Sequence, residues 1–352
     1  MNILYGVQTT GNGHINKSRV IVRELKGRGH DVRVIFSGEQ QDLEGRVESF
    51  RPYRVFKGLT YVTENGKINY IKTAPRLDAF SYVRDILTYD AGDIDLVITD
   101  FEPVSVQVAK RNKIPSVGIS HQYVFQHDVP YPPLQLMVRT IMEYFVPADF
   151  TVPLHWHHFG FPILPPIFAP ARIETQSAPV RKYAVVYLPY EDPKKIMEML
   201  RYCPPQFDYY VFTRVREKRK MGNVVLFPRD RQAFLNKLSL AEGAILNAGF
   251  TANSEAFDMG VKTLVKPISG QAEQIANAMA VEQLGLGMKM DEFDPDTVKE
   301  WLDMPPIRAM HYPDTAKRFA DWIEQGIFNT DTLTEMCEEQ WSKVPIPRIF
   351  RR

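Results

Sequence analysis

The chain has 352 residues, and at roughly 100–200 residues per domain this length predicts two domains. Hydrophobic residues make up 44% of the sequence and charged residues 24%, a mixture that excludes a disordered chain. Lys and Arg number 43 against 42 for Asp and Glu, so the net charge of +1 argues against a nucleic-acid-binding protein. Two cysteines exclude a disulfide framework.

The N-terminus shows no secretory signal, and the sequence contains no apolar run of about 18 residues that could cross a bilayer. We therefore expect a cytoplasmic protein. Residues 131–144 and the tail 345–352 are apolar with scattered Arg and are candidates for peripheral contact with the inner face of the membrane, although packing within the fold is the commoner role of such segments.

In the first half of the chain, short runs rich in Val and Ile predict strands at residues 2–8, 31–37, 95–99 and 115–120. Apolar residues at helical spacing predict helices at 15–27, 103–112 and 134–145. Asn65 and Gly66 lie between strand-like residues and predict a hairpin turn.

Prolines cluster between Pro153 and Pro179, and they exclude a continuous helix or a central strand there. The second half then predicts strands at 183–188, 209–213, 224–227, 243–246 and 263–267. Helices are expected at 193–201, 231–238, 253–259 and 272–284.

Such alternation produces parallel sheets covered by helices on both faces. We expect an α/β fold of two Rossmann-like doubly wound domains that face each other across a cleft. The expected divisions are a first domain at 1–160, a Pro-rich linker at 161–180 and a second domain at 181–330. A C-terminal helix and tail at 331–352 would pack back on the first domain.

The first candidate site follows the first strand, where Gly11, Asn12, Gly13 and His14 precede a helix. Glycines permit a tight turn, and a helix N-terminus attracts an anion. The spacing matches neither the dinucleotide fingerprint nor a P-loop. The alternative is a glycine turn in which His14 caps the helix.

Asp100 ends a later strand, and the carboxyl ends of parallel strands meet at one edge of the sheet. A carboxylate beside an imidazole selects its tautomer and makes it a general base for a hydroxyl. The alternative role of Asp100 is to cap the helix that begins at Pro103.

The third candidate site is residues 246–256, where small residues again join a strand to a helix. Backbone amides and Thr251 suit a diphosphate, and Glu255 suits ribose hydroxyls. Glu273 and Gln274 follow the next strand and suit the hydroxyls of an attached sugar.

These motifs resemble GT-B glycosyltransferases, in particular the UDP-glycosyltransferases and the bacterial enzyme that adds N-acetylglucosamine to lipid-linked muramoyl-pentapeptide. The chain is most similar to a bacterial and archaeal branch that has Asp-Phe-Glu-Pro after the catalytic strand. Gly249 and Phe250 match the family's glycine and aromatic residue, and Glu255 matches its ribose-binding glutamate. The resemblance implies donor binding by Phe227, Asn247, Ala248, Gly249, Phe250, Thr251, Asn253, Glu255, Gln271, Glu273, Gln274 and Asn277.

The resemblance implies inverting transfer of a sugar from a nucleotide-diphosphate sugar, expected to be a UDP-sugar, to an acceptor hydroxyl. His14 would be the base and Asp100 its partner, and no metal would be required. Asn247 replaces a histidine of the UDP-glycosyltransferases, and their base-stacking block is reduced to residues 226–230, where Phe227 would stack on the base. By the same resemblance, the domain at 1–160 would bind the acceptor and the domain at 181–330 the nucleotide sugar. The acceptor would be a sugar, a lipid-linked molecule or a small molecule, in the cell envelope or in secondary metabolism. The alternatives are a nucleotide-sugar 2-epimerase and a non-catalytic nucleotide-sugar-binding protein.

Two further patterns in the sequence resemble metal-binding motifs. Asp93 and Asp95 spell D-x-D, but they precede a buried strand instead of following one. His155, His157 and His158 lack a nearby Cys or carboxylate pattern, so a polar linker is the better interpretation.

Overall fold

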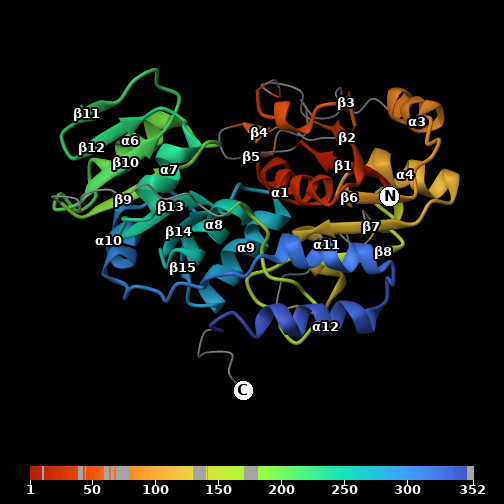
Figure 1. The fold of residues 1–352 in the computed structure, drawn as a ribbon. Helices are drawn as coiled ribbons and strands as arrows, with labels where there is room; N and C mark the ends of the chain where they lie inside the picture. The colour runs from red at the N-terminus through yellow and green to blue at the C-terminus, as the bar shows by residue number, and fades with distance from the viewer. Residues whose placement is uncertain are drawn as a thin grey trace. The chain divides into compact units, whose positions relative to one another are not determined.

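The structure is a computed structural model that describes residues 1–9, 12–38, 43, 45–58, 63–64, 67–68, 79–129, 140, 142–169 and 181–346. The chain divides into two compact units (Figure 1). The first contains residues 1–62, 69–169 and 312–344, and the second contains residues 63–68, 170–311 and 345–352. The main segment of the second unit ends at His311, before the division expected at residue 330, and the helices at 315–325 and 330–341 belong to the first unit.

The first unit contains a six-stranded sheet in the order β3-β2-β1-β6-β7-β8, with every neighbouring pair parallel. Its strands are β1 (Asn2–Gln8), β2 (Asp31–Ser37), β3 (Tyr53–Phe56), β6 (Leu96–Asp100), β7 (Ser116–Ser120) and β8 (Phe150–Pro153). Its helices are α1 (Gly13–Gly27), η1 (Glu48–Phe50), α3 (Ala79–Thr88), α4 (Pro103–Asn112), η3 (His121–Gln126), α11 (Thr315–Gln325) and α12 (Thr330–Trp341).

The second unit contains a seven-stranded sheet in the order β11-β12-β10-β9-β13-β14-β15, parallel except for the pair β11 and β12. Its strands are β9 (Tyr183–Tyr187), β10 (Asp208–Phe212), β11 (Arg219–Met221), β12 (Val224–Phe227), β13 (Gly243–Asn247), β14 (Thr263–Lys266) and β15 (Gly287–Lys289). Its helices are α6 (Pro193–Leu200), α7 (Arg231–Leu238), α8 (Phe250–Asp258), α9 (Ala272–Gln283) and α10 (Pro295–Asp303). The hairpin strands β4 (Thr63–Glu64) and β5 (Lys67–Ile68) also belong to this unit.

Both sheets have the strand order of a doubly wound fold. Read by their position in the chain, the six parallel strands of each sheet run 3-2-1-4-5-6, and the order reverses between the first and fourth strands. These reversal points lie between β1 and β6 in the first unit and between β9 and β13 in the second. The predicted α/β fold class is confirmed, and ligands in such sheets bind beyond the carboxyl ends of the strands at these points.

Alternating side chains explain why the second sheet is covered on both faces. Ala184 and Val186 of β9 pack in a cluster with residues of α6 and α10, whereas Tyr183 and Val185 pack with residues of α7 and α8. A strand buried on both faces reads as a continuous apolar run, which is how β9 appears in the sequence.

The C-terminal helices are held to the first unit by aromatic and polar contacts. The rings of Phe150 in β8 and Trp322 in α11 have centroids 5.5 Å apart, and Trp341 Nε1 donates to the carbonyl of Ile163 at 2.6 Å. Arg28 pairs with Asp321 at 2.6 Å. The first domain is thus completed by residues more than 140 positions beyond its last earlier segment, which ends at residue 169.

Several expected features lie outside the described residues. These are Gly11, the turn residues Asn65 and Gly66, most of the helix expected at 134–145, residues 170–180 of the linker and residues 347–352 of the tail. Among the described helices, none combines the length and the apolar character needed to cross a membrane.

Candidate functional site

His14 and Asp100 meet at the reversal point of the first sheet. His14 is the second residue of α1, which follows β1, and Asp100 is the last residue of the neighbouring strand β6. His14 Nδ1 lies 2.7 Å from Asp100 Oδ1. With Nδ1–H donating to the carboxylate, the lone pair of the ring is on Nε2, the tautomer that can accept a proton from a hydroxyl.

Asp100 is fully buried and accepts hydrogen bonds from several groups. Besides His14, the donors are Lys17 Nζ at 2.7 Å to Oδ1, Ser18 Oγ at 3.0 Å to Oδ2 and Ser120 Oγ at 3.0 Å to Oδ1. Burial alone would raise the pKa of Asp100, but the charges and hydrogen bonds of His14 and Lys17 outweigh it and lower the pKa to about 2. The carboxylate is therefore ionised at neutral pH.

Asp100 does not cap α4; Glu102 does. Its carboxylate accepts from Val104 N at 2.7 Å and from Ser105 N at 2.6 Å, and Ser37 Oγ also donates to it at 2.5 Å. The alternative capping role of Asp100 is therefore wrong, because the helix begins at Pro103 and its N-cap is the residue directly before it. Burial raises the pKa of Glu102, although these hydrogen bonds oppose the rise.

α1 begins at Gly13, two residues earlier than predicted, and its N-cap is Asn12, so the alternative in which His14 caps the helix is wrong. The side chain of Asn12 makes no capping hydrogen bond. The sequence analysis did not single out Lys17, Ser18, Ser120 or Gln122. Gln122 Nε2 lies 3.3 Å from His14 Nε2, on the side of the ring away from Asp100. Lys17 and Ser18 follow His14 by three and four residues, so helical spacing predicts that they lie on the same face of the helix as His14.

In the second unit, α8 begins directly beyond β13. Gly249 is the N-cap, and no side chain caps the helix there. Asn253 Nδ2 donates to the carbonyls of Asn247 at 3.0 Å and Gly249 at 2.6 Å, and Asn277 Nδ2 donates to Ala248 O at 2.8 Å. These two amides hold the loop carbonyls, so Asn253 and Asn277 shape the loop in this structure.

The uncapped N-termini are a shared feature of the predicted ligand-binding helices. Side chains cap α4, α6, α7, α10, α11 and α12, whereas α1, α8 and α9 have no such hydrogen bond at their N-caps, which are Asn12, Gly249 and Gln271. The first amides of a helix have no partner within it. At α1, α8 and α9 the N-cap side chains do not bind those amides, an arrangement that suits the binding of an anionic ligand.

Glu255 lies in the second turn of α8 and is paired with Arg231 at the start of α7. Both guanidinium Nη atoms reach its carboxylate, Nη2 to Oε1 and Nη1 to Oε2, the latter at 3.5 Å. Burial raises the pKa of Glu255, and Arg231 opposes the rise. Sequence reasoning missed Arg231, because an ion pair between two helices leaves no local signal.

Phe227 is partly buried and contacts neighbouring side chains. Its ring stacks on Phe212 with centroids 5.1 Å apart, and the ammonium of Lys218 lies 5.3 Å from the centroid of the Phe227 ring. Phe250 and Thr251 are the first two residues of α8, and both are partly buried.

The remaining predicted donor residues lie at the start of α9. Gln271 is its N-cap, Glu273 is in its first turn, and Gln274 Oε1 accepts from Ile268 N at 3.0 Å. Beside them, at the carboxyl ends of β9 and β14, Glu191 and Lys266 lie 3.7 Å apart, a buried pair that the sequence analysis missed.

The metal-like patterns have structural roles. Asp93 pairs with Arg33 at 2.8 Å, and Asp95 Oδ2 accepts from Asn2 N at 2.8 Å, so both lie before β6 and away from its carboxyl end. Within the described part of the chain, no group of three or more His, Cys, Asp or Glu is placed to hold a metal ion.

The three histidines after β8 make local turns. The Nδ1 atoms of His155, His157 and His158 each accept a hydrogen bond from the backbone two residues later, at 3.2, 2.8 and 3.0 Å. His155 and His157 are buried, so the expected polar linker is wrong for them.

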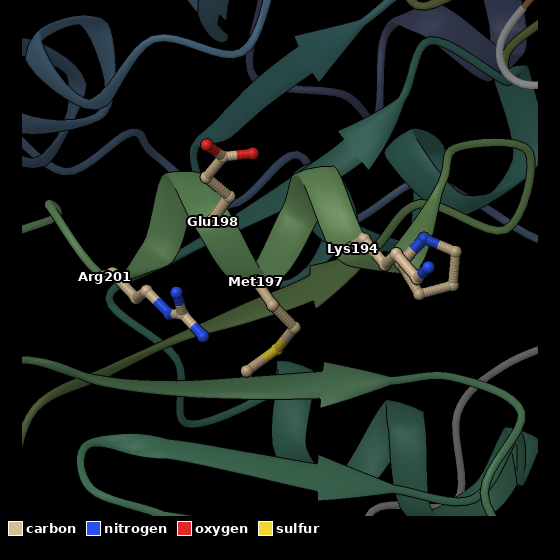
Figure 2. Close-up of a pocket in the computed structure, with 5 residues that line it drawn as sticks. Lys194, Met197, Glu198 and Arg201 are labelled. Atoms are coloured by element: carbon tan, nitrogen blue, oxygen red, sulfur yellow. The ribbon is translucent and has the colours of Figure 1, made fainter.

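The second unit has a hollow of about 420 Å³, lined by Pro193, Lys194, Met197, Glu198 and Arg201. Figure 2 shows these side chains along one helix. All five residues come from α6 or the turn that ends it. None follows the carboxyl end of a strand, and we assign this hollow no ligand.

Comparison with known proteins decides the family. Residues 1–306 match glycosyl transferase family 1. The chain belongs to this family. Together with the two doubly wound units, this confirms the predicted GT-B glycosyltransferase class and identifies the protein as an enzyme of glycosyl transfer.

Solved structures of the same fold are distant in sequence. SnogD from Streptomyces nogalater is 16% identical with a TM-score of 0.56, covering 97% of this chain and 96% of SnogD. The spinosyn forosaminyltransferase SpnP is 14% identical with a TM-score of 0.59, covering 99% and 96%. VinC, solved in complex with dTDP, is 14% identical with a TM-score of 0.56, covering 97% and 99%. A comparison with curated proteins found no match.

Proposed function

We propose that this glycosyltransferase transfers a sugar from a nucleotide-diphosphate sugar, a UDP-sugar in the first instance, to an acceptor hydroxyl with inversion. The observation that carries the proposal is the 2.7 Å contact between His14 Nδ1 and Asp100 Oδ1. It leaves the lone pair of Nε2 for the acceptor proton. The contact of Gln122 Nε2 with that nitrogen is one that an acceptor hydroxyl would replace.

The reaction then follows from the two sites. His14 Nε2 takes the acceptor proton while the acceptor oxygen forms a bond to the anomeric carbon from the face opposite the diphosphate. The bond from that carbon to the diphosphate breaks, and the leaving group carries away the electron pair. Asp100 stabilises the imidazolium that forms, and the amides at the start of α8 stabilise the diphosphate.

The second unit supports an anionic nucleotide. α8 presents an N-terminus without a side-chain cap, and Glu255 and Arg231 lie near its start. We propose that Glu255 binds the ribose, with Arg231 holding the carboxylate in place. That VinC is solved with dTDP, and SpnG with the spinosyn aglycone, supports a nucleotide-sugar donor and a small-molecule acceptor.

The experiment is a panel of UDP-, dTDP- and GDP-sugars, each tested for thermal stabilisation of the chain and for release of nucleoside diphosphate with phenolic and alcoholic acceptors. His14→Ala should abolish release and retain the stabilisation by the donor. His30→Ala is the matched control, because His30 pairs with Glu324 in the same unit at 3.1 Å and away from Asp100.

Each outcome separates one alternative. A donor that stabilises the chain without any turnover indicates a non-catalytic binding protein, and conversion of the donor to its 2-epimer indicates an epimerase. Stabilisation by none of the nucleotide sugars contradicts the proposal. Full activity of His14→Ala removes His14 as the base.

A further inference from the structure

Lys17 is a buried lysine one turn after His14 on α1. Its side chain is 7% exposed, and its Nζ donates to Asp100 Oδ1 at 2.7 Å and to the carbonyl of Ile119 at 2.9 Å. Burying an ammonium is costly unless it is paired and hydrogen-bonded, as Lys17 is.

The position of Lys17 matters because it shares an oxygen with His14. His14 Nδ1 and Lys17 Nζ both lie 2.7 Å from Asp100 Oδ1. Two cations thus compete for one negative charge whenever the ring of His14 is protonated. The interaction is strong because Asp100 is fully buried, where water screens charges weakly.

We propose that Lys17 is a positioning residue that anchors Asp100 and shares its charge, so that the ring of His14 holds a proton less tightly than a histidine–aspartate pair alone would. This inference rests on the proposed role of His14 as the base. With Lys17 present, proton uptake takes the trio of side chains from neutral to a charge of +1. Without Lys17, the remaining pair would go from −1 to neutral, which favours uptake.

Lys17 also fixes the position of the Asp100 carboxylate. Through Ile119 O, Lys17 ties the carboxylate at the end of β6 to the backbone of the neighbouring strand β7. The carboxylate therefore stays in place when the ring of His14 gains or loses a proton.

The other titratable groups that face Asp100 do not change this balance. Among the residues that the structure describes, these are, besides His14 and Lys17 from α1, Tyr5 from β1 and Tyr123 from η3. Burial raises the pKa of both tyrosines, and both stay neutral in the range where imidazoles titrate.

The test is an NMR titration of the whole chain labelled with [13C]histidine, recorded without substrate. The sequence has eight histidines, and the signal of His14 is assigned by its loss in His14→Gln. In Lys17→Met, the titration midpoint of this signal should move to higher pH by about one unit or more. Lys17→Arg keeps the charge and should stay close to the wild type.

Lys262→Met is the matched control, since Lys262 is a buried lysine of the second unit that donates to the carbonyls of Leu302 and Met304. It should leave the His14 midpoint unchanged. If Lys17→Met does not fold, Lys17→Gln keeps a donor toward Asp100 without the charge and should show the same upward shift.

An unchanged or lowered midpoint in the neutral variants overturns the proposal, as does an equal shift in Lys262→Met. The titration needs no substrate, so its result is separate from that of the nucleotide-sugar panel. If a donor and an acceptor are found, the acid limb of kcat/KM should move to higher pH in Lys17→Met by the same amount.

Discussion

Asp100→Asn is the substitution for which the structure gives the clearest expectation. Asp100 is completely buried, and its carboxylate pairs with the side chains of His14 and Lys17. Asparagine has nearly the same shape, so the substitution removes the charge and leaves the packing. Lys17 would then be a buried cation without its carboxylate partner.

The magnitude follows from the ionisation of the carboxyl. At about 1.4 kcal/mol for each pKa unit, lowering the pKa from 3.8 to about 2 corresponds to about 2–3 kcal/mol of stability at neutral pH. Removing one partner of a buried ion pair costs about 3–5 kcal/mol in other proteins. We therefore expect Asp100→Asn to lower the free energy of unfolding of the first unit by about 3 kcal/mol.

The pH dependence has a definite sign. A carboxyl whose pKa is lowered by folding stabilises the protein above its unfolded pKa, and that contribution is lost as the pH falls toward the folded value. The part of the difference between wild type and variant that comes from ionisation of the Asp100 carboxyl should be constant above about pH 5. It should shrink between about pH 4 and pH 2.

The assay is urea unfolding followed by tryptophan fluorescence. Three of the four tryptophans, Trp156, Trp322 and Trp341, lie in the first unit, so the signal reports mainly on that unit. Asp93→Asn is the control, because the Asp93 side chain is 61% exposed and water screens its pair with Arg33, so this substitution should change the stability little. Equal stability of Asp100→Asn and wild type, or a difference that grows in acid, would refute the reasoning.

Three further predictions concern other parts of the fold. Gly6→Ala should destabilise the first unit by about 1–3 kcal/mol in the same urea assay, because its Cβ would lie 2.0 Å from Ser105 Oγ; a neutral effect would contradict the tight approach. Burial, and after it the charge of His158, lowers the pKa of His157 to about 4. Between pH 6.5 and pH 4 the unfolded state therefore binds a proton that the folded state does not, and about 3 kcal/mol of the free energy of unfolding should be lost as the pH falls through this range. His157→Asn, which keeps an acceptor for the turn, should show a shallower loss of melting temperature over this range, and an identical slope would exclude His157 as the cause. Burial raises the pKa of the Cys203 thiol to about 12 and also raises that of the Cys337 thiol. Neither thiol should therefore react with a disulfide reagent at pH 8 until denaturant is added. Rapid labelling of the native chain would contradict this expectation.

Local patterns in the sequence predicted most of the elements around the site. Runs of β-branched residues marked β1, β2 and β12 with the bounds that the structure has, and the spacing of apolar residues did the same for α4 and α7. Where a bound differed, the cause was local too. α8 begins at Phe250, three residues earlier than predicted, since Gly249 is the N-cap.

Some features were readable in the sequence and were missed. Proline at the first position of α4 indicates that the preceding residue, Glu102, is the N-cap, and this would have excluded Asp100 from that role. Lys17 lies at helical spacing from His14, but a lysine in an apolar helix more often points to solvent than into a site.

The sequence by itself determined the class of fold, the two halves and the residues that follow the carboxyl ends of the strands, because these depend on interactions among close neighbours in the chain. Only the tertiary structure decided which side chains meet. His14 and Asp100 are 86 positions apart, and Arg231 and Glu255 lie on different helices. α11 packs against β8, a strand that lies far earlier in the sequence. Such pairings depend on the order of the strands in a sheet. That order is selected by the burial of apolar faces across the whole unit, and no local sequence pattern determines it.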